Sequence, residues 1–118
     1  DAVILDLYWF GKEMKATMGN FEFEKDSFPN PKKMISDLKE KGVKTILITE
    51  PFVLTTSKKW NDAVENDILG KTVEGKPYSY DFYFGNTGLI DVFKPEGNKW
   101  FSYRAIDKAD IKSIDKVQ

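Results

Sequence analysis

The sequence predicts an α/β fold class built around a βαβ unit. Two predominantly apolar runs, Ala2–Leu5 and Val43–Thr49, flank a stretch with helical periodicity. Such runs are typical of strands that are covered on both faces, as in parallel sheets. A strand–helix–strand order makes the two strands parallel and joins them by a right-handed crossover. Their carboxyl ends are therefore expected at the same edge of the sheet.

A long loop precedes the helix of this unit. Residues Lys12–Phe28 are polar and punctuated by glycine, with three phenylalanines spaced through them. Long ordered loops of this kind are usually functional. Phe21 and Phe23 alternate with glutamates, which predicts a short strand that carries both rings on one face. We expect an ordered loop that its aromatic side chains hold in place.

The helix itself carries start and stop signals. Asn30 is a favourable N-cap, and Pro31 suits the first helical position because its missing N–H costs nothing there. Gly42 is suited to close the helix. The apolar stripe consists of Met34, Ile35 and Leu38. This pattern predicts one amphipathic helix between Pro31 and Gly42.

The second half of the chain predicts two more helices separated by extended segments. Thr56 or Ser57 is expected to cap a helix that ends at Gly70, and Pro95 is expected to open another. The apolar positions of these helices are Trp60, Val64 and Ile68 in the first, and Trp100 and Phe101 in the second.

Between these helices, residues 71–93 are rich in turns and aromatic residues. Thr72–Lys76 predicts a tight bend, and Gly85–Gly88 predicts a loop before a strand at Leu89–Phe93. Four aromatic residues alternate with other residues on a predicted strand: Tyr78, Tyr80, Phe82 and Phe84. The tail, Tyr103–Gln118, repeats Ile-Asp-Lys and is expected to form either an amphipathic helix or two short strands.

Composition excludes several classes of function. The chain has 118 residues, a net charge of −1, and neither cysteine nor histidine. It has no basic stripe for nucleic acid and no apolar run long enough to span a membrane. Without these two residue types there is no thiol or Ser-His-Asp catalysis and no imidazole or thiolate metal ligand. Any chemistry must rest on carboxylates, lysine, tyrosine or backbone groups, and no cofactor is expected.

The candidate site lies where the two predicted strands end. The first strand is followed by Asp6, Tyr8 and Trp9, and the second ends with Ile48 and Glu50. Ligands of parallel α/β folds sit at the carboxyl ends of strands. Aromatic rings stack on the apolar faces of sugars, while carboxylates accept hydrogen bonds from hydroxyl groups. The pattern therefore indicates a saccharide site.

Two other interpretations stay open from the residues alone. In the first, Asp6 caps a loop, the aromatic rings of Tyr8 and Trp9 belong to the core, and Glu50 only forms the turn with Pro51. In the other, Asp6, Glu50 and Asp91 form an acidic metal site, although these residues lie on separate strands without ligand spacing.

Taken together, the segments resemble the catalytic domain of glycoside hydrolase family 31, which contains α-glucosidases and α-xylosidases. The resemblance rests on an ordered set of phrases over Asp1–Phe101. These phrases are DLYWFG, MGNFEF, FPNPKKMISDLKEKGVKTILITEPFV, GKPY and GLIDVFKPEGNKWF. It implies part of a (β/α)₈ TIM barrel, with the early βα units and an extended aromatic-rich insertion.

The resemblance also implies roles for individual residues. Asp6 would accept hydrogen bonds from the sugar, Tyr8 and Trp9 would border it, and Ile48 would line one wall. Glu50 and Asp91 would have supporting or structural roles. The implied substrate is an oligosaccharide or polysaccharide with α-linked glucose or xylose, and polysaccharide-degrading relatives are often exported from the cell.

One family feature is missing from the sequence. Family members are retaining enzymes with an Asp nucleophile and an Asp acid/base about 5 Å apart, and no nucleophile phrase follows Phe101. We therefore expect a hydrolase fragment, residues 1–101, that contributes part of the sugar pocket but no catalytic residue. Residues 102–118 would be a tail of a different origin, for which a distal β-domain of the parent is one source. The chain begins without Met, which fits a segment that needs the remainder of its barrel for stability and activity. The alternative is a non-catalytic carbohydrate-binding or interaction module.

Overall fold

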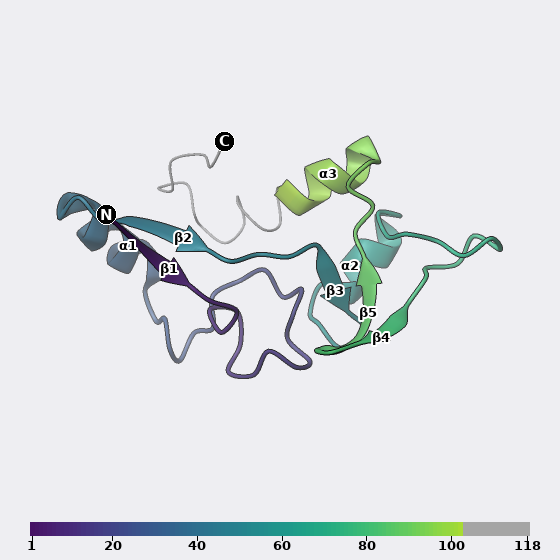
Figure 1. The fold of residues 1–118 in the computed structure, drawn as a ribbon, viewed down its shortest axis with the longest axis horizontal. Coiled ribbons are helices and arrows are strands. Elements are labelled where there is room, and N and C mark those ends of the chain that lie inside the picture. The colour runs from purple at the N-terminus through teal and green to yellow at the C-terminus, as the bar shows by residue number, and fades with distance from the viewer. Residues whose placement is uncertain (103–118) are drawn as a thin grey trace.

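The computed structural model describes residues 1–102, which form a small mixed α/β structure (Figure 1). The elements in chain order are β1 (Ala2–Leu5), α1 (Pro31–Glu40), β2 (Lys44–Leu47), β3 (Phe52–Leu54), α2 (Trp60–Glu65), β4 (Tyr80–Phe82), β5 (Gly85–Leu89) and α3 (Pro95–Ser102). β1, β2 and α1 lie at one end of the elongated molecule, and the other elements lie at the opposite end. The expectations for Tyr103–Gln118 fall outside the described residues.

The predicted βαβ unit is confirmed. β1 and β2 are parallel, in a register that pairs Ala2 with Lys44 and Leu5 with Leu47. The ladder continues one step further, where the amide of Ile48 donates to the carbonyl of Leu5 at 3.0 Å. Both strands therefore end at the same edge, as the strand order predicted.

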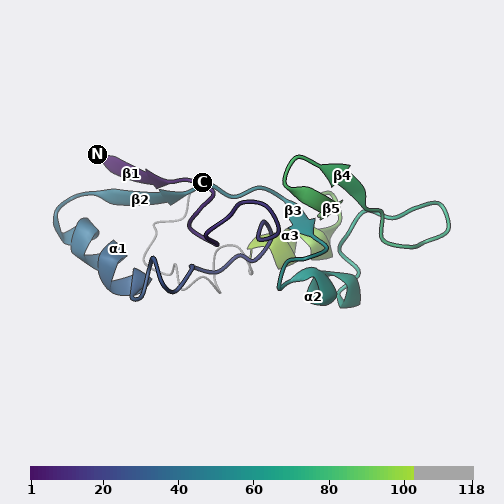
Figure 2. The same ribbon diagram turned by 90° about the horizontal axis from the view of Figure 1, so that it is seen from below.

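The two parallel strands are not covered on both faces within residues 1–102, as expected of a segment that needs the remainder of its barrel. Val3 is 38% exposed, Ile4 62% and Ile46 40%. The reason is that the sheet has two strands here and α1 lies along one side of it (Figure 2). The other face and the outer edges of β1 and β2 have no covering element among the described residues.

Helix α1 forms for the local reasons that the sequence gives. The Asn30 side chain accepts a 3.1 Å hydrogen bond from the amide of Lys33, and Pro31 occupies the first turn. The helix ends at Glu40, and Gly42 follows with a φ of +76°, a conformation that suits glycine. Ile35 is buried, so the apolar stripe faces the protein as predicted.

The second sheet is antiparallel, with the strand order β3-β5-β4. It corrects the prediction of a loop at Gly85–Gly88, because these residues belong to β5. Glycine is needed inside this strand for packing: a Cβ at Gly88 would lie 2.8 Å from Cζ3 of Trp60. The tight bend is confirmed, since the amide of Thr72 donates to the carbonyl of Lys76 at 2.8 Å.

Helix α2 is shorter than predicted. Its N-cap is Lys59, which makes no side-chain capping bond, and the hydroxyl of Ser57 instead donates to the carbonyl of Leu54. Ile68 is buried but lies beyond the helix, while Ala63 fills the buried position within it. Helix α3 begins at Pro95 as predicted and buries Trp100.

Two hydrophobic clusters hold the described residues together. The Trp9 cluster consists of Leu7, Trp9, Phe10, Met18, Phe23, Ile35 and Leu54. The Trp100 cluster consists of Phe21, Val53, Ala63, Ile68, Leu69, Ile90 and Trp100. The long loop contributes to both clusters.

The predicted strand with Phe21 and Phe23 on one face is wrong. Phe21 has a φ of +49°, which turns its ring away from that of Phe23. Phe21 packs edge-on against Trp100, with ring centroids 6.0 Å apart, whereas Phe23 lies 5.2 Å from Trp9. No helix among residues 1–102 has the length and apolar character needed to cross a lipid bilayer.

Candidate functional site

Asp6 is the first residue beyond β1 and begins a tight turn. Its carbonyl accepts a hydrogen bond from the amide of Trp9 at 3.1 Å, and its Oδ1 accepts one from the amide of Leu7 at 2.7 Å. The side chain is exposed, and no described protein group donates to its Oδ2. The backbone thus fixes the carboxylate at the strand end and leaves one oxygen open to a ligand.

Trp9 joins the ends of the two parallel strands. Its ring is 1% exposed, and its Nε1 donates a 2.8 Å hydrogen bond to the carbonyl oxygen of Ile48. The buried ring therefore offers no face to a ligand. It holds Ile48, which is half-buried, at a fixed place relative to the turn that begins at Asp6.

Glu50 follows β2 at the edge where Asp6 follows β1, and its side chain is half-buried. The next residue, Pro51, accepts a 2.9 Å hydrogen bond from the amide of Ile90. This bond links the strand end to the antiparallel sheet. The Glu50-Pro51 turn therefore connects the two parts of the molecule.

Asp91 does not gather with Asp6 and Glu50. Its Oδ1 accepts hydrogen bonds from the amides of Phe93 at 3.2 Å and Lys94 at 3.3 Å. These bonds shape the turn that leads into α3. Among residues 1–102, no group of three or more acidic, histidine or cysteine side chains is placed to hold a metal ion.

A shallow cavity of about 300 Å³ lies beside Tyr8 and includes a residue that the sequence did not indicate. Its lining residues are Tyr8, Lys12, Glu13, Met14, Lys15 and Tyr83. Tyr8 is 55% exposed and Tyr83 72%. The cavity therefore has two accessible aromatic rings, which are far apart in the sequence.

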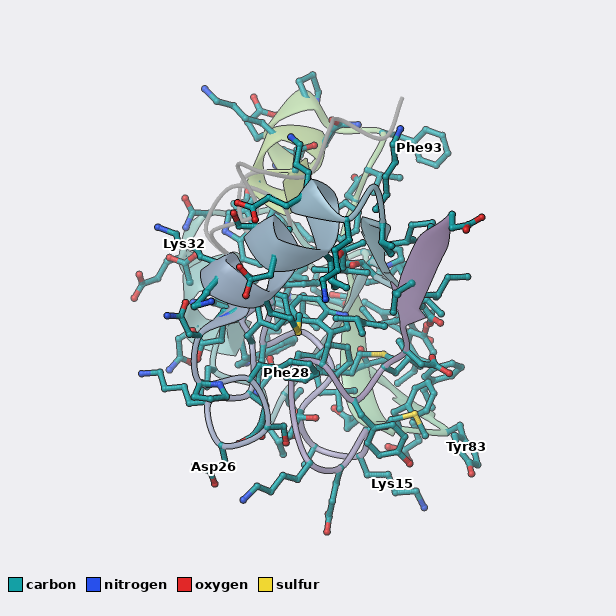
Figure 3. The ribbon with its side chains drawn as sticks, turned by 90° about the vertical axis from the view of Figure 1, so that its left-hand side faces the viewer. Lys15, Asp26, Phe28, Lys32, Tyr83 and Phe93 are labelled. Atoms are coloured by element: carbon teal, nitrogen blue, oxygen red, sulfur yellow. The ribbon has the colours of Figure 1, made fainter. Side chains whose placement is uncertain are left out.

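A long-range contact brings Tyr83 to this cavity. The amide of Ala16 donates to the carbonyl of Phe84 at 3.3 Å, which fixes the long loop against the turn between β4 and β5. The Nζ of Lys15 lies 5.3 Å from the ring centroid of Tyr83, and both side chains project at the same corner of the molecule (Figure 3). No local sequence signal reports such a contact, and the sequence pattern placed Tyr83 within a predicted strand rather than in a turn.

The loop supplies a second ammonium group, which stays charged. Lys12 Nζ lies 2.5 Å from Oδ2 of Asp26. The hydrogen bond to Asp26, and then its negative charge, raise the pKa of Lys12. The cavity thus combines aromatic faces with hydrogen-bond donors and one carboxylate, Glu13. Such a mixture fits a polar ligand with apolar faces.

Comparison with known proteins identifies one family across almost the whole chain. The family model described as "Glycosyl hydrolases family 31 TIM-barrel domain" matches residues 1–117. Alpha-glucosidase 2 from Bacillus thermoamyloliquefaciens is 26% identical over 103 residues, which are 86% of this chain and 12% of that protein. Myogenesis-regulating glycosidase from Mus musculus is 29% identical over 84 residues, or 70% of this chain and 12% of that protein.

Solved structures show the same fold. A family 31 α-xylosidase from a soil metagenome, complexed with xylose, aligns with a TM-score of 0.76 at 24% identity. The alignment covers 97% of this chain and 16% of that one. The chain therefore spans about an eighth of the length of the two relatives above, and its fold corresponds to part of a family 31 TIM-barrel domain.

Proposed function

The chain belongs to glycoside hydrolase family 31, and from this premise we propose that it forms part of the sugar pocket of a retaining α-glycoside hydrolase. The substrate is a saccharide with α-linked glucose or xylose. In support, one relative is named an α-glucosidase and another an α-xylosidase. One structural neighbour holds xylose and another holds glucose.

One observation carries this proposal. Asp6 and Ile48 leave two parallel strands at the same edge, and the indole of Trp9 bridges the two strand ends. In TIM barrels the active site is built at the carboxyl ends of the strands. The edge that carries Asp6 is therefore the face on which a substrate of the complete barrel binds.

The proposed roles follow from exposure and contacts. Asp6 accepts hydrogen bonds from sugar hydroxyls through its open Oδ2, Tyr8 stacks on the sugar, and Ile48 lines one wall. Trp9, because it is buried, positions Ile48 without touching the sugar. Glu50 and Asp91 support the turns that lead to the antiparallel sheet and to α3. The nucleophile and the acid/base come from the remainder of the barrel.

The test is Asp6→Asn in the complete hydrolase, assayed with aryl α-glucosides and α-xylosides. Loss of a hydrogen bond to a charged group lowers kcat/KM by roughly 10- to 100-fold. Asp37→Asn is the matched control, because Asp37 pairs with Lys33 on the exposed side of α1. An Asp6→Asn variant that keeps the wild-type kcat/KM would contradict the proposal.

The same assay separates a non-catalytic carbohydrate-binding module from a hydrolase. The exposed rings of Tyr8 and Tyr83 are the observation that favours such a module. In that case the wild-type protein binds saccharides without hydrolysing them. Tyr8→Ala would then weaken binding more than Asp6→Asn does.

A further inference from the structure

A row of aromatic rings extends from the candidate pocket along the β4–β5 hairpin. We define the aromatic strip as Tyr78, Tyr80, Phe82 and Phe84, which alternate along the chain. Tyr80 and Phe82 lie on one side of β4, Tyr78 precedes the strand, and Phe84 lies in the turn that follows it. The rings of Tyr78 and Tyr80 stack, with centroids 5.7 Å apart and planes inclined by 25°. Phe82 lies 6.4 Å from Tyr80 and 5.4 Å from Phe84, in both cases edge to face.

The strip is continuous with the pocket. The ring of Tyr83, which lines the pocket, lies 5.2 Å from that of Phe84 at the end of the strip. From Tyr83 the rings therefore follow one another, each in contact with the next, as far as Tyr78. Phe52 stacks on Phe82, in the middle of the row, with ring centroids 4.7 Å apart.

The strip is accessible at its far end. Tyr78 is 51% exposed, although one face of its ring stacks on Tyr80. Phe82 is 36% exposed. An exposed patch of this kind, beside polar groups such as the hydrogen-bonded Asn86 and Asp81, marks a ligand or partner surface.

The chemistry of the strip favours a saccharide as its occupant. Its members are all aromatic, and two of them carry hydroxyl groups that donate and accept hydrogen bonds. Flat rings with polar tips match the alternation of C–H faces and hydroxyls along a sugar chain. We propose that the aromatic strip binds the sugar units of an oligosaccharide whose end sits in the pocket beside Tyr8. This inference rests on the proposed function and extends it to long substrates.

The length of the strip sets which substrates reach it. Tyr78 is the fourth ring beyond Tyr83 along this row, and neighbouring ring centroids lie 5.2 to 6.4 Å apart. The row is therefore longer than one sugar unit. A disaccharide or an aryl glycoside held in the pocket therefore does not contact Tyr78, whereas a longer oligosaccharide does.

The experiment compares Tyr78→Ala with the wild type in the complete hydrolase, over a series of α-gluco-oligosaccharides of increasing length and an aryl α-glucoside. We expect KM for the longer oligosaccharides to rise roughly 3- to 10-fold, the loss of one aromatic stacking contact. KM for the aryl glycoside stays unchanged. Tyr78→Phe retains the ring and keeps most of the affinity.

The matched control is Phe93→Ala, which removes a ring that is 96% exposed and belongs to a turn outside the strip. A Tyr78→Ala variant with the same KM change for short and long substrates, or with none, overturns the inference. The inference is also overturned if Tyr78→Ala changes the sedimentation coefficient of the protein but not its KM, since the strip would then contact another protein surface.

A binding measurement keeps this inference separate from the proposed function. Affinity electrophoresis of the same variants in gels that contain a soluble α-glucan reports retardation without hydrolysis. If the wild type is retarded, Tyr78→Ala is not, and no substrate is hydrolysed, the strip is confirmed and the hydrolase proposal fails. If wild type and Tyr78→Ala are equally retarded and the substrate is hydrolysed, the inference about the strip fails and the hydrolase proposal stands.

Discussion

The indole Nε1 of Trp9 donates a 2.8 Å hydrogen bond to the carbonyl oxygen of Ile48, across 39 residues of chain. The bond connects the turn after β1 to the first residue after β2. It lies just beyond the last ladder pair of the parallel sheet, Leu5 and Leu47. The relative position of the two strand ends, and with it the shape of the candidate site, depends on this contact.

Substituting Trp9 by Phe removes that bond and leaves a partly buried carbonyl without its donor. We expect the complete protein to lose about 1–3 kcal/mol of unfolding free energy, measured by urea denaturation. Tyr8→Phe is the control, because Tyr8 is exposed and its substitution stays within about 0.5 kcal/mol. Equal stability of the two variants would show that the bond contributes nothing.

The uncovered parallel sheet predicts that the isolated 118-residue chain self-associates. Val3, Ile4 and Ile46 are exposed, and the outer edges of β1 and β2 are unpaired among the described residues. Exposed apolar strands with free edges pair with other chains. Sedimentation velocity combined with circular dichroism is expected to show oligomers, and Ile4→Lys is expected to shift them toward monomer. A monomer that melts cooperatively is the result that would refute this.

Gly97 is predicted to tolerate no larger residue. A Cβ at this position would lie 2.0 Å from the carbonyl oxygen of Asp91, so α3 would have to move. We expect Gly97→Ala to cost about 1–3 kcal/mol of stability and to increase protease cleavage around α3. Gly70→Ala serves as the control, since its nearest neighbour, the Leu89 carbonyl oxygen, is 3.8 Å away. Comparable stability of the two variants would argue against the close packing of α3.

The ion pairs of Asp67 with Lys71 and Lys94 are predicted to make the protein less stable at acidic pH. Hydrogen bonds from Lys71, and then from Lys94, lower the pKa of the Asp67 carboxyl below the ordinary 3.8. Because the folded pKa is the lower one, the stabilisation is complete above the ordinary value and disappears as the pH falls through the lowered one. Asp67→Asn should remove this dependence, and asparagine tolerates the positive φ of +56° at this position.

Thermal melts of both proteins from neutral to strongly acidic pH measure the effect. The wild type should be more stable than Asp67→Asn at neutral pH, and the two should converge at low pH. A difference in melting temperature between the two proteins that stays the same at every pH would mean that the carboxylate charge does not contribute to stability.

The βαβ unit and the start of α1 could be predicted because their causes are local. Apolar runs define the strands, and Asn30 and Pro31 set the helix start within a few residues. The prediction failed where distant residues decide. β5 contains Gly88 because Trp60 packs over it, and Phe21 turns away from Phe23 because its ring packs against Trp100.

In the candidate site, too, the features with local causes could be predicted and those that depend on distant residues could not. The position of Asp6 at a strand end follows from the strand order. The burial of Trp9 and the contribution of Tyr83 depend on how the long loop folds between the two sheets. The pattern of aromatic letters does not distinguish a ring in the core from a ring at the surface.

The loop residues Phe21 and Phe23 belong to different clusters, although one residue separates them. The segment therefore connects the two hydrophobic clusters, because each ring packs into a different one. An insertion or deletion between Gly19 and Phe23 would move one of the two rings out of its cluster. Natural variation in loop length should therefore be confined to the exposed residues Lys25–Ser27.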